Sequence, residues 1–341
     1  MRLKWTEEKL NEMLCTPSDA LVADIAKIEG DILVLGASGK MGPTLCMLAK
    51  NAIDKAGIAK KVYAVARFSD KESEKLLRDN GVETITCDLS NTQQLAALPD
   101  CKNIIYMAGR KFGTDGNEWQ TWGMNSLVPA FVVDRFRDAN YVVFSSGNIY
   151  PKTNISLGGC SEKMPTGPIG EYAESCLARE RTFEYGANTF GAKVFMYRLN
   201  YAVDLRYGVI YDIAKKIMEG TPISLSMPTF NCVWQGYANE VAIRGLLHCE
   251  NPVNIMNVTG PETVSVKKTA LTLASMLGKE AIIVDEPSDT ALLSDSAKCM
   301  ETFGYPTVSV NTLIKWQAEW IIDGGRALGK PTHFEERNGK F

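Results

Sequence analysis

The chain has 341 residues, a formal net charge of −3 and a hydrophobic content of 45%. This size and composition predict a globular protein made of one large α/β domain or two coupled domains. Lys and Arg are spread along the chain, and no apolar run reaches the roughly 18–20 residues that span a bilayer. We therefore expect no nucleic-acid partner and no membrane insertion.

The cysteines and histidines argue against a disulfide framework and against a metal site. The nine cysteines are scattered without a CxxC pair, and the only two histidines, His248 and His333, are far apart in sequence. The N-terminal sequence MRLKWTEEKL has no apolar core of the kind found in signal peptides. These features predict a cytoplasmic protein with no metal.

Residues 1–30 are predicted to form a helical N-terminal extension. Thr6 is a candidate cap for a helix at Glu7–Leu14, and Ser18 precedes a second helix at Asp19–Ile28. The apolar residues of both helices form a stripe, which suits packing or an oligomer contact rather than chemistry.

The stretch Asp31–Gly42, DILVLGASGKMG, combines a short apolar strand, three spaced glycines and the start of a helical pattern. Gly36 permits a tight turn, Gly39 lets backbone approach a pyrophosphate, and Gly42 allows close packing of helix on strand. The N-terminus of the helix would attract the phosphates. An ordinary strand-to-helix turn is the alternative interpretation.

Apolar strands then alternate with amphipathic helices. The predicted strands are Ile32–Leu35, Val62–Ala66, Val82–Thr86, Asn103–Met107, Tyr141–Ser145 and Lys193–Leu199. The predicted helices are Lys40–Ala56, Lys71–Arg78, Thr92–Leu98, Asn117–Arg137 and Gly170–Asn188. This alternation predicts an α/β fold with a doubly wound parallel sheet, and after a glycine turn it favours a dinucleotide-binding domain of the Rossmann type.

The alternation stops near residue 200. We expect the Rossmann domain to occupy residues 31–200 and a smaller α/β substrate cap, interleaved with the sheet, to occupy residues 201–322. A helix at Ile210–Met218 begins the cap, and residues 323–341 are predicted to form an extended tail.

Two polar residues follow the second and third predicted strands. Arg67, with Ser69 nearby, favours NADP over NAD, because an arginine here pairs with the 2′-phosphate of the adenosine ribose. A solvated surface arginine is the alternative. Asp88 suits the adenine amino group, and it also suits a helix N-cap.

A hydroxyl pair and a tyrosine supply candidate chemistry. Ser145 and Ser146 end a strand at the edge where ligands bind, and Tyr172 lies near the start of a long helix. A tyrosine can transfer a proton during hydride transfer, provided that its pKa falls below the usual value of about 10. A lysine four residues later would supply the charge, but that position is Cys176.

These segments follow one another in a recognisable order. They are GASGKMG, Asp88 after the third strand, YMAG, Asn125, SSGNIYP with Tyr172, RLNYAVD and NVTGPETVSVKKTA. From Asp31 to Ile322 the chain resembles the extended short-chain dehydrogenase/reductases of the sugar epimerase and dehydratase type. The last motif resembles a strand and helix of the family's substrate domain.

The resemblance implies a role for each matching residue. Catalysis would fall to Ser146 and the acid/base Tyr172, with Cys176 at the position of the family's lysine. The cofactor-binding residues would be Gly36, Ser38, Gly39, Lys40, Met41, Gly42, Arg67, Asp88, Leu89, Met107, Ala108, Gly109, Asn125, Tyr172, Leu199 and Asn200. The substrate-facing residues would be Lys111, Phe112, Ser146, Asn148, Arg206 and Trp234. A homodimer paired through the two long helices is also implied.

The sequence departs from the family pattern in two places. Cys176 replaces the lysine that lowers the pKa of the tyrosine; it would be a neutral thiol, a thiolate or, least expected, a nucleophile, and Arg179 is a candidate replacement cation. FNCVWQGYANEVA lacks the arginine that often binds a sugar-nucleotide diphosphate, which favours a smaller sugar or sugar acid. Arg206 is then a candidate anion contact or a surface arginine, and Trp234 a sugar-stacking or packing residue.

The sequence therefore predicts an NAD(P)-dependent epimerase, dehydratase or dehydrogenase that acts on a sugar or sugar acid through Tyr172. The alternative is a non-catalytic dinucleotide sensor or partner-binding module of the same fold.

Overall fold

The computed structural model describes residues 4–340 and contains a central seven-stranded sheet. The strand order is β12-β7-β5-β4-β1-β2-β3, and every neighbouring pair is parallel. The strands are β1 (Ile32–Leu35), β2 (Val62–Ala66), β3 (Glu83–Thr86), β4 (Asn103–Tyr106), β5 (Asn140–Ser146), β7 (Lys193–Leu199) and β12 (Asn254–Val258). The predicted α/β fold with a parallel sheet is confirmed.

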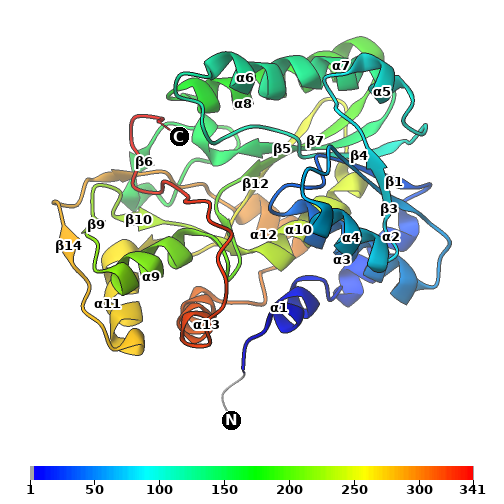
Figure 1. Cartoon of the computed structure of the whole chain (residues 1–341). Helices are drawn as coiled ribbons and strands as arrows, with labels where there is room; N and C mark the ends of the chain where they lie inside the picture. The colour runs from blue at the N-terminus through cyan, green and yellow to red at the C-terminus, as the bar shows by residue number, and fades with distance from the viewer. Residues whose placement is uncertain (1–3, 341) are drawn as a thin grey trace.

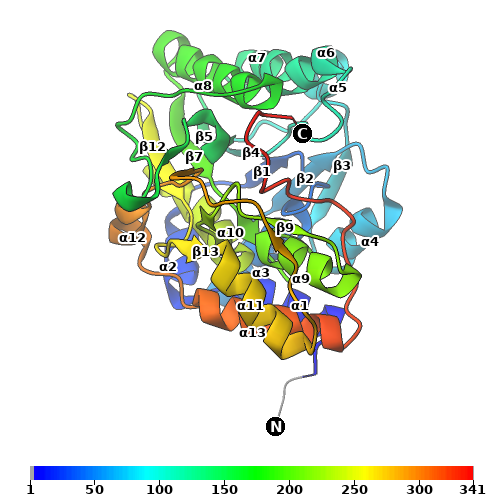
Figure 2. The same ribbon diagram turned by 90° about the vertical axis from the view of Figure 1, so that its left-hand side faces the viewer.

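Helices cover both faces of the sheet. Those that surround it are α3 (Gly42–Ala56), α4 (Lys71–Asp79), α5 (Thr92–Ala96), α6 (Glu118–Trp122), α7 (Val128–Arg135), α8 (Glu171–Phe190) and α10 (Gln235–Arg244). Figures 1 and 2 show α6, α7 and α8 on one face and α3 and α10 on the other. Side chains of β1 alternate between the two cores: Leu33 and Leu35 join one, Ile32 and Val34 the other.

The long helix predicted at Asn117–Arg137 is interrupted. A π-helical segment, Gly123–Leu127, separates α6 from α7, and the N–H of Val128 donates to the carbonyl of Gly123. Pro129 has no N–H to donate to the carbonyl four residues earlier, so the regular α-helical ladder cannot continue there. The predicted long helix therefore forms over residues 118–135, with a π-helical segment that the sequence pattern did not predict.

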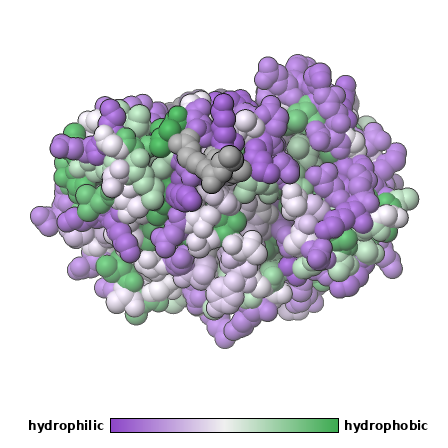
Figure 3. All heavy atoms as spheres, turned by 90° about the horizontal axis from the view of Figure 1, so that it is seen from below, coloured by the Kyte–Doolittle hydropathy of each residue, from purple (hydrophilic) through white to green (hydrophobic). Residues whose placement is uncertain are grey.

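The N-terminal helices, α1 (Glu7–Leu14) and α2 (Asp19–Lys27), form where they were predicted. Thr6 accepts a hydrogen bond from the N–H of Lys9 at 3.2 Å, and Ser18 caps α2. Their apolar residues Leu10, Leu14, Leu21 and Ile25 are completely buried. The stripe therefore serves packing within the chain. On the face of the molecule shown in Figure 3, hydrophilic residues dominate and hydrophobic residues form small groups.

The second half of the chain builds a smaller layer beside the carboxyl ends of the strands (Figure 1). Its helices are α9 (Val209–Glu219), α11 (Val266–Leu277), α12 (Ala297–Phe303) and α13 (Val310–Ile322). Its short strands pair as β8 (Ala202–Val203) with β11 (Val233–Trp234), β9 (Ile223–Ser224) with β14 (Ile283–Val284), β10 (Thr229–Phe230) with β13 (Val264–Ser265), and β6 (Thr153–Asn154) with β15 (Thr290–Ala291). The 3₁₀ turns are Gly147–Ile149, Ile155–Leu157 and Gly245–His248.

The motif NVTGPETVSVKKTA forms a strand and a helix of the smaller layer, as expected. They are β13, which pairs with β10, and α11. The first two residues of the motif end β12, the edge strand of the main sheet. Long-range parallel pairing with β7 decides this placement, and local sequence does not report it.

The tail after α13 contains no helix or strand in its described part, residues 323–340. It rises from α13 across the front of the smaller layer towards the start of α8 (Figures 1 and 2). There Gly339 packs directly against Gly170, the residue that precedes α8. The tail thus bridges the two halves of the molecule.

Within residues 4–340, no helix is long and apolar enough to cross a membrane, and no three His, Cys, Asp or Glu side chains are grouped to hold a metal. All nine cysteines are free thiols. The homodimer stays a prediction.

A buried ion pair joins α8 to the sheet. Arg198 of β7 donates to Glu180 of α8 at 3.0 and 2.7 Å, and Ser145 donates to the same carboxylate at 2.6 Å. Arg198 also donates to the hydroxyl of Tyr150, which in turn donates to Asn257 of β12. The side chains of Glu180 and Arg198 are 0% and 3% exposed.

We expect Arg198→Met to destabilise the fold by about 3–5 kcal/mol, because it leaves the Glu180 carboxylate buried and unpaired. Urea unfolding monitored by circular dichroism measures the change. As a control, Arg137→Met removes an exposed partner of Asp134 and should cost less than about 1 kcal/mol. Equal losses in the two variants would contradict a special role for the buried pair.

Candidate active site

The β1–α3 turn forms a cradle suited to a pyrophosphate. Gly36 has φ +92°, and a Cβ there would lie 2.5 Å from the backbone nitrogen of Ala108. A Cβ on Gly42 would collide with the carbonyl of Ala37. A Cβ on Gly39 would make only an ordinary 3.5 Å contact, so the chain itself does not require glycine at that position. The exposed backbone at Gly39, just before α3, therefore fits close approach by a ligand's phosphates.

Arg67 and Asp88, the residues expected at the adenosine end of the cofactor, follow β2 and β3. Asp88 accepts hydrogen bonds from the N–H and hydroxyl of Ser90. These bonds, with a smaller contribution from the charge of Arg67, lower the pKa of Asp88. Asp88 is not the helix cap that was the alternative, because Asn91 caps α5.

A cavity of about 250 Å³ lies at the other end of the cradle, beyond the carboxyl ends of β4, β5 and β7. Ten of the predicted site residues line it: Gly39, Lys40, Met41, Met107, Lys111, Ser146, Asn148, Tyr172, Leu199 and Asn200. Five further residues line the cavity: Phe144, Ser145, Tyr201, Ala202 and Tyr207. Ser145 was expected at this edge of the sheet, and Tyr201 follows Asn200 in the RLNYAVD motif. Phe144, Ala202 and Tyr207 were missed, although Ala202 falls within the same motif.

Tyr172 and Ser146 meet in this cavity. The Tyr172 side chain is hydrogen-bonded to the side chains of Ser146 and Cys176. Ser146 ends β5, and its hydroxyl oxygen also accepts from the N–H of Asn148 at 3.1 Å. Burial raises the pKa of Tyr172, the Cys176 thiol adds to the increase, and the charge of Arg179 and the bond from Ser146 oppose it.

Cys176 is completely buried, and burial raises the pKa of its thiol. This favours the neutral thiol over the thiolate among the alternatives left open by the sequence. Cys176 packs with Ile149, Tyr150 and Cys160. A buried neutral thiol is a poor nucleophile, so the residue supplies neither a cation nor a reactive group.

Two lysines line the same cavity. Lys40 donates to the carbonyl of Ala202 at 2.7 Å and lies 3.6 Å from the centroid of the Tyr207 ring. Lys111 Nζ lies 5.6 Å from the centroid of the Tyr172 ring and donates to the carbonyl of Thr332 at 3.3 Å. Burial lowers the pKa of Lys40 to about 7 and that of Lys111 to about 8.

Asn125 and Arg179 form a buried support behind the cavity. The π-helical segment points Asn125 inward, where its carbonyl oxygen accepts from the N–H of Arg110 and from Arg179 at 2.6 Å. Arg179 also donates to the carbonyl of Phe144 at 2.8 Å, so its guanidinium is fixed against β5. A Cβ on Gly109 would lie 2.6 Å from this guanidinium.

Other predicted residues lie outside this cavity. Arg206 is 7% exposed and is bound by Asp204 and Glu7, so the structure supports neither an anion contact nor a surface arginine. Trp234 is buried against Trp316, which supports packing and not sugar stacking. Phe112 lies beside His333 of the tail. Ala108 packs on Gly36, Ser38 is exposed at the cradle, and Leu89 is buried beyond β3.

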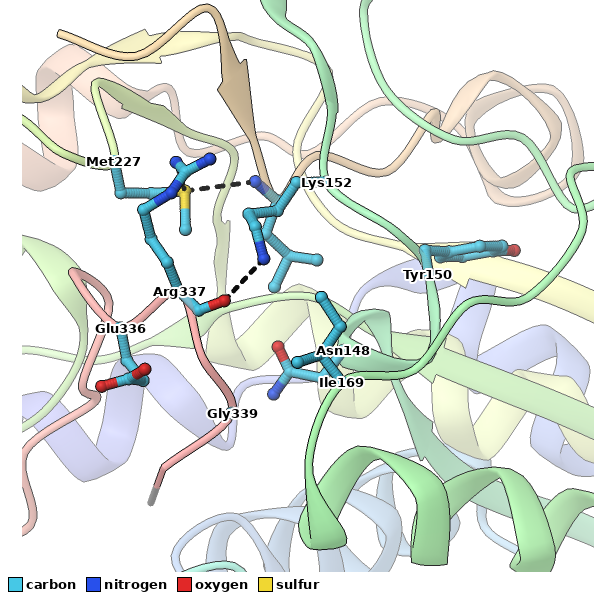
Figure 4. Close-up of a pocket in the computed structure, with 9 residues that line it drawn as sticks. Asn148, Tyr150, Lys152, Ile169, Met227, Glu336, Arg337 and Gly339 are labelled. Carbon is cyan, nitrogen blue, oxygen red and sulfur yellow. Dashed lines mark hydrogen bonds between the residues drawn. The ribbon is translucent and has the colours of Figure 1, made fainter.

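The tail covers the side of the site that faces the smaller layer. Thr332 donates its N–H and hydroxyl to Asp212 of α9 at 2.7 and 2.6 Å. Arg337 donates to the carbonyls of Ser226 and Thr290, and Lys152 donates to the carbonyl of Arg337 at 2.6 Å. Figure 4 shows Arg337 and Gly339 across a cavity of about 30 Å³ from Asn148. Sequence reasoning left the tail out of the site.

Similar solved structures share this architecture. The UDP-glucuronic acid 4-epimerase of Bacillus cereus aligns with a TM-score of 0.69 at 18% identity, covering 86% of this chain and 99% of its own. The UDP-glucose 4-epimerase of Thermotoga maritima aligns with a TM-score of 0.70 at 16% identity and the same coverage. At this identity the likeness concerns the fold. No curated protein sequence matches the chain.

The family assignment rests on the sequence itself. Residues 32–231 match the model of the NAD dependent epimerase/dehydratase family, and this match spans more than half of the chain. It includes the glycine cradle, Ser146 and Tyr172, and it ends before the tail. The protein therefore belongs to the NAD-dependent epimerase/dehydratase family, whose members are NAD(P)-dependent enzymes of the extended short-chain dehydrogenase/reductase type.

Proposed function

We propose that the protein oxidises a carbinol carbon of a sugar or sugar acid with NAD(P), as the first half of an epimerisation or dehydration or as a dehydrogenation. The observation that carries the proposal is the hydrogen bond between Tyr172 and Ser146 in a cavity that continues from the glycine cradle. The UDP-sugar 4-epimerases that share the fold add support for a carbohydrate substrate.

Different residues of the chain bind the cofactor, orient the substrate and transfer the proton. Gly39 and the start of α3 would hold the pyrophosphate, and the cavity would hold the nicotinamide end, which would supply hydride acceptance and return. Ser146 donates to the reacting oxygen and orients it. The Tyr172 oxygen takes the hydroxyl proton as the carbonyl forms and gives a proton back on the return step.

Arg67 supports a preference for NADP over NAD. It is exposed at the end of β2, beside Asp88, where its guanidinium is available to the 2′-phosphate of the adenosine ribose. A guanidinium makes strong bidentate hydrogen bonds to a phosphate.

We expect Tyr172→Phe to lower turnover by about 10²–10⁴-fold, because it removes the proton carrier and leaves the cradle intact. Product formation from a panel of sugars and sugar acids, together with absorbance at 340 nm for any net reduction of NAD(P), measures the loss, and calorimetry should still show cofactor binding. The matched control is Tyr185→Phe on the exposed face of the same helix. Full activity in Tyr172→Phe would refute the proposed mechanism, and cofactor binding without turnover of any substrate would favour the sensor alternative.

We expect Arg67→Ala to weaken NADP binding by roughly ten- to a hundredfold, because a charged hydrogen bond contributes about 1.5–3 kcal/mol. NAD affinity should change little. Calorimetric titration of both cofactors gives the two constants, and Arg181→Ala, an exposed arginine of α8, is the control. An unchanged NADP/NAD ratio would exclude Arg67 as the selective residue.

A further inference from the structure

The proposed proton transfer requires a positive charge near Tyr172. Burial and the Cys176 thiol both raise the pKa of this tyrosine, so the phenolate is disfavoured unless a cation lies close by. Cys176 lies four residues further along the same face of α8, and its thiol is hydrogen-bonded to the Tyr172 side chain. The thiol is neutral, so it supplies no positive charge. The charge of Arg179 on the same helix lowers the pKa of Tyr172 but does not outweigh burial, so a further cation must come from another element packed around the ring.

Lys111 is the cation best placed for this role. It lies on the loop between β4 and α6, lines the same cavity as Tyr172 and Ser146, and brings its ammonium to 5.6 Å from the centre of the Tyr172 ring. Its other surroundings are the Phe112 ring at 5.7 Å and the Thr332 carbonyl of the tail at 3.3 Å. The loop and the tail together fix the ammonium beside the tyrosine.

The other two cations near the cavity, Lys40 and Arg179, donate hydrogen bonds to groups other than Tyr172. The ammonium of Lys40, on the β1–α3 turn, is bound to the Ala202 carbonyl and stacked on Tyr207. Arg179 lies seven residues along α8, about 10 Å along the helix axis from Tyr172, and its guanidinium is bonded to Asn125 and the Phe144 carbonyl. Arg179 therefore acts on Tyr172 only at a distance.

The acidic and titratable groups around Lys111 do not cancel its charge. Asp212 of α9 accepts two hydrogen bonds from Thr332, and burial raises the pKa of its carboxyl. His333 of the tail packs near Phe112. The thiol of Cys176 is neutral because its pKa is raised. Lys111 has a pKa of about 8, so it carries its charge in neutral solution.

We propose, on the basis of the function proposed above, that Lys111 is the positioning residue that stabilises the Tyr172 phenolate, and that the C-terminal tail keeps Lys111 in place. In the reaction the substrate hydroxyl loses its proton to the phenolate oxygen, and Lys111 stays protonated throughout. The loop thus supplies a positive charge that the residue at position 176 does not, and it adds to the charge of Arg179 on the tyrosine's own helix.

The pKa of Tyr172 can be measured without knowing the substrate, so it tests the role of Lys111 directly. The absorbance of tyrosinate is recorded against pH in NADP-loaded protein. For the parent and for each variant, the curve of the same protein carrying Tyr172→Phe is subtracted, which leaves the signal of Tyr172. In the parent protein we expect Tyr172 to ionise below its usual pKa of about 10. Lys111→Met should raise this pKa by about one to three units, as expected for loss of a nearby opposite charge.

Two further variants separate charge from structure. Lys111→Arg keeps the charge and should restore most of the parent titration. Lys111→Gln should behave like Lys111→Met, and it takes the place of Lys111→Met if that variant folds poorly. Lys152→Met is the matched control, because it removes a lysine that contacts the tail at Arg337 without lining the cavity of Tyr172. It should leave the titration unchanged.

The same set of variants reports on catalysis once a substrate is known. The alkaline rise of kcat should move to higher pH in Lys111→Met and return in Lys111→Arg. A Tyr172 titration that is identical in the parent and in both neutral variants overturns the role of Lys111, as does a parent protein in which Tyr172 stays protonated until alkaline unfolding. Full activity of Tyr172→Phe instead overturns the proposed function, so the two failures are distinguishable.

Discussion

The rotational setting of α8 controls the site, and two consecutive buried residues fix it. Arg179 bonds to Asn125 and to the Phe144 carbonyl, while Glu180 bonds to Arg198 and Ser145. Both anchors reach β5, the strand that ends at Ser146. Because a helix held at two adjacent positions cannot turn about its axis, Tyr172 is kept against Ser146 although it lies two turns away.

The electrostatics of the cavity follow from the loops that surround this helix. Its two lysines come from the turn after β1 and the loop after β4, and each donates to a backbone carbonyl, Lys40 to Ala202 and Lys111 to Thr332. Carbonyls fix an ammonium without neutralising it. Positive charge thus persists beside buried hydroxyls, a condition that favours their anionic forms and the binding of anionic ligands.

Local pattern was enough to predict the parallel sheet and the glycine turn, because each depends on short segments, whereas the joint role of Ser146 and Tyr172 was implied by the family resemblance. The place of β12 and the docking of the tail depend on contacts between distant segments. Arg206 shows the same limit: its partners Asp204 and Glu7 include a residue nearly 200 positions away, so sequence left it as a candidate anion contact.

The contact between Gly339 and Gly170 has a consequence for comparing relatives. A Cβ on Gly339 would overlap the Ile169 carbonyl, and one on Gly170 would lie 2.5 Å from the Gly339 carbonyl. The two positions are therefore expected to vary together in evolution. A relative that keeps both glycines should also keep a docked tail, whereas one with a side chain at position 339 must route its C-terminal segment elsewhere. This pair gives a simple sequence marker for a tail that packs against the start of α8.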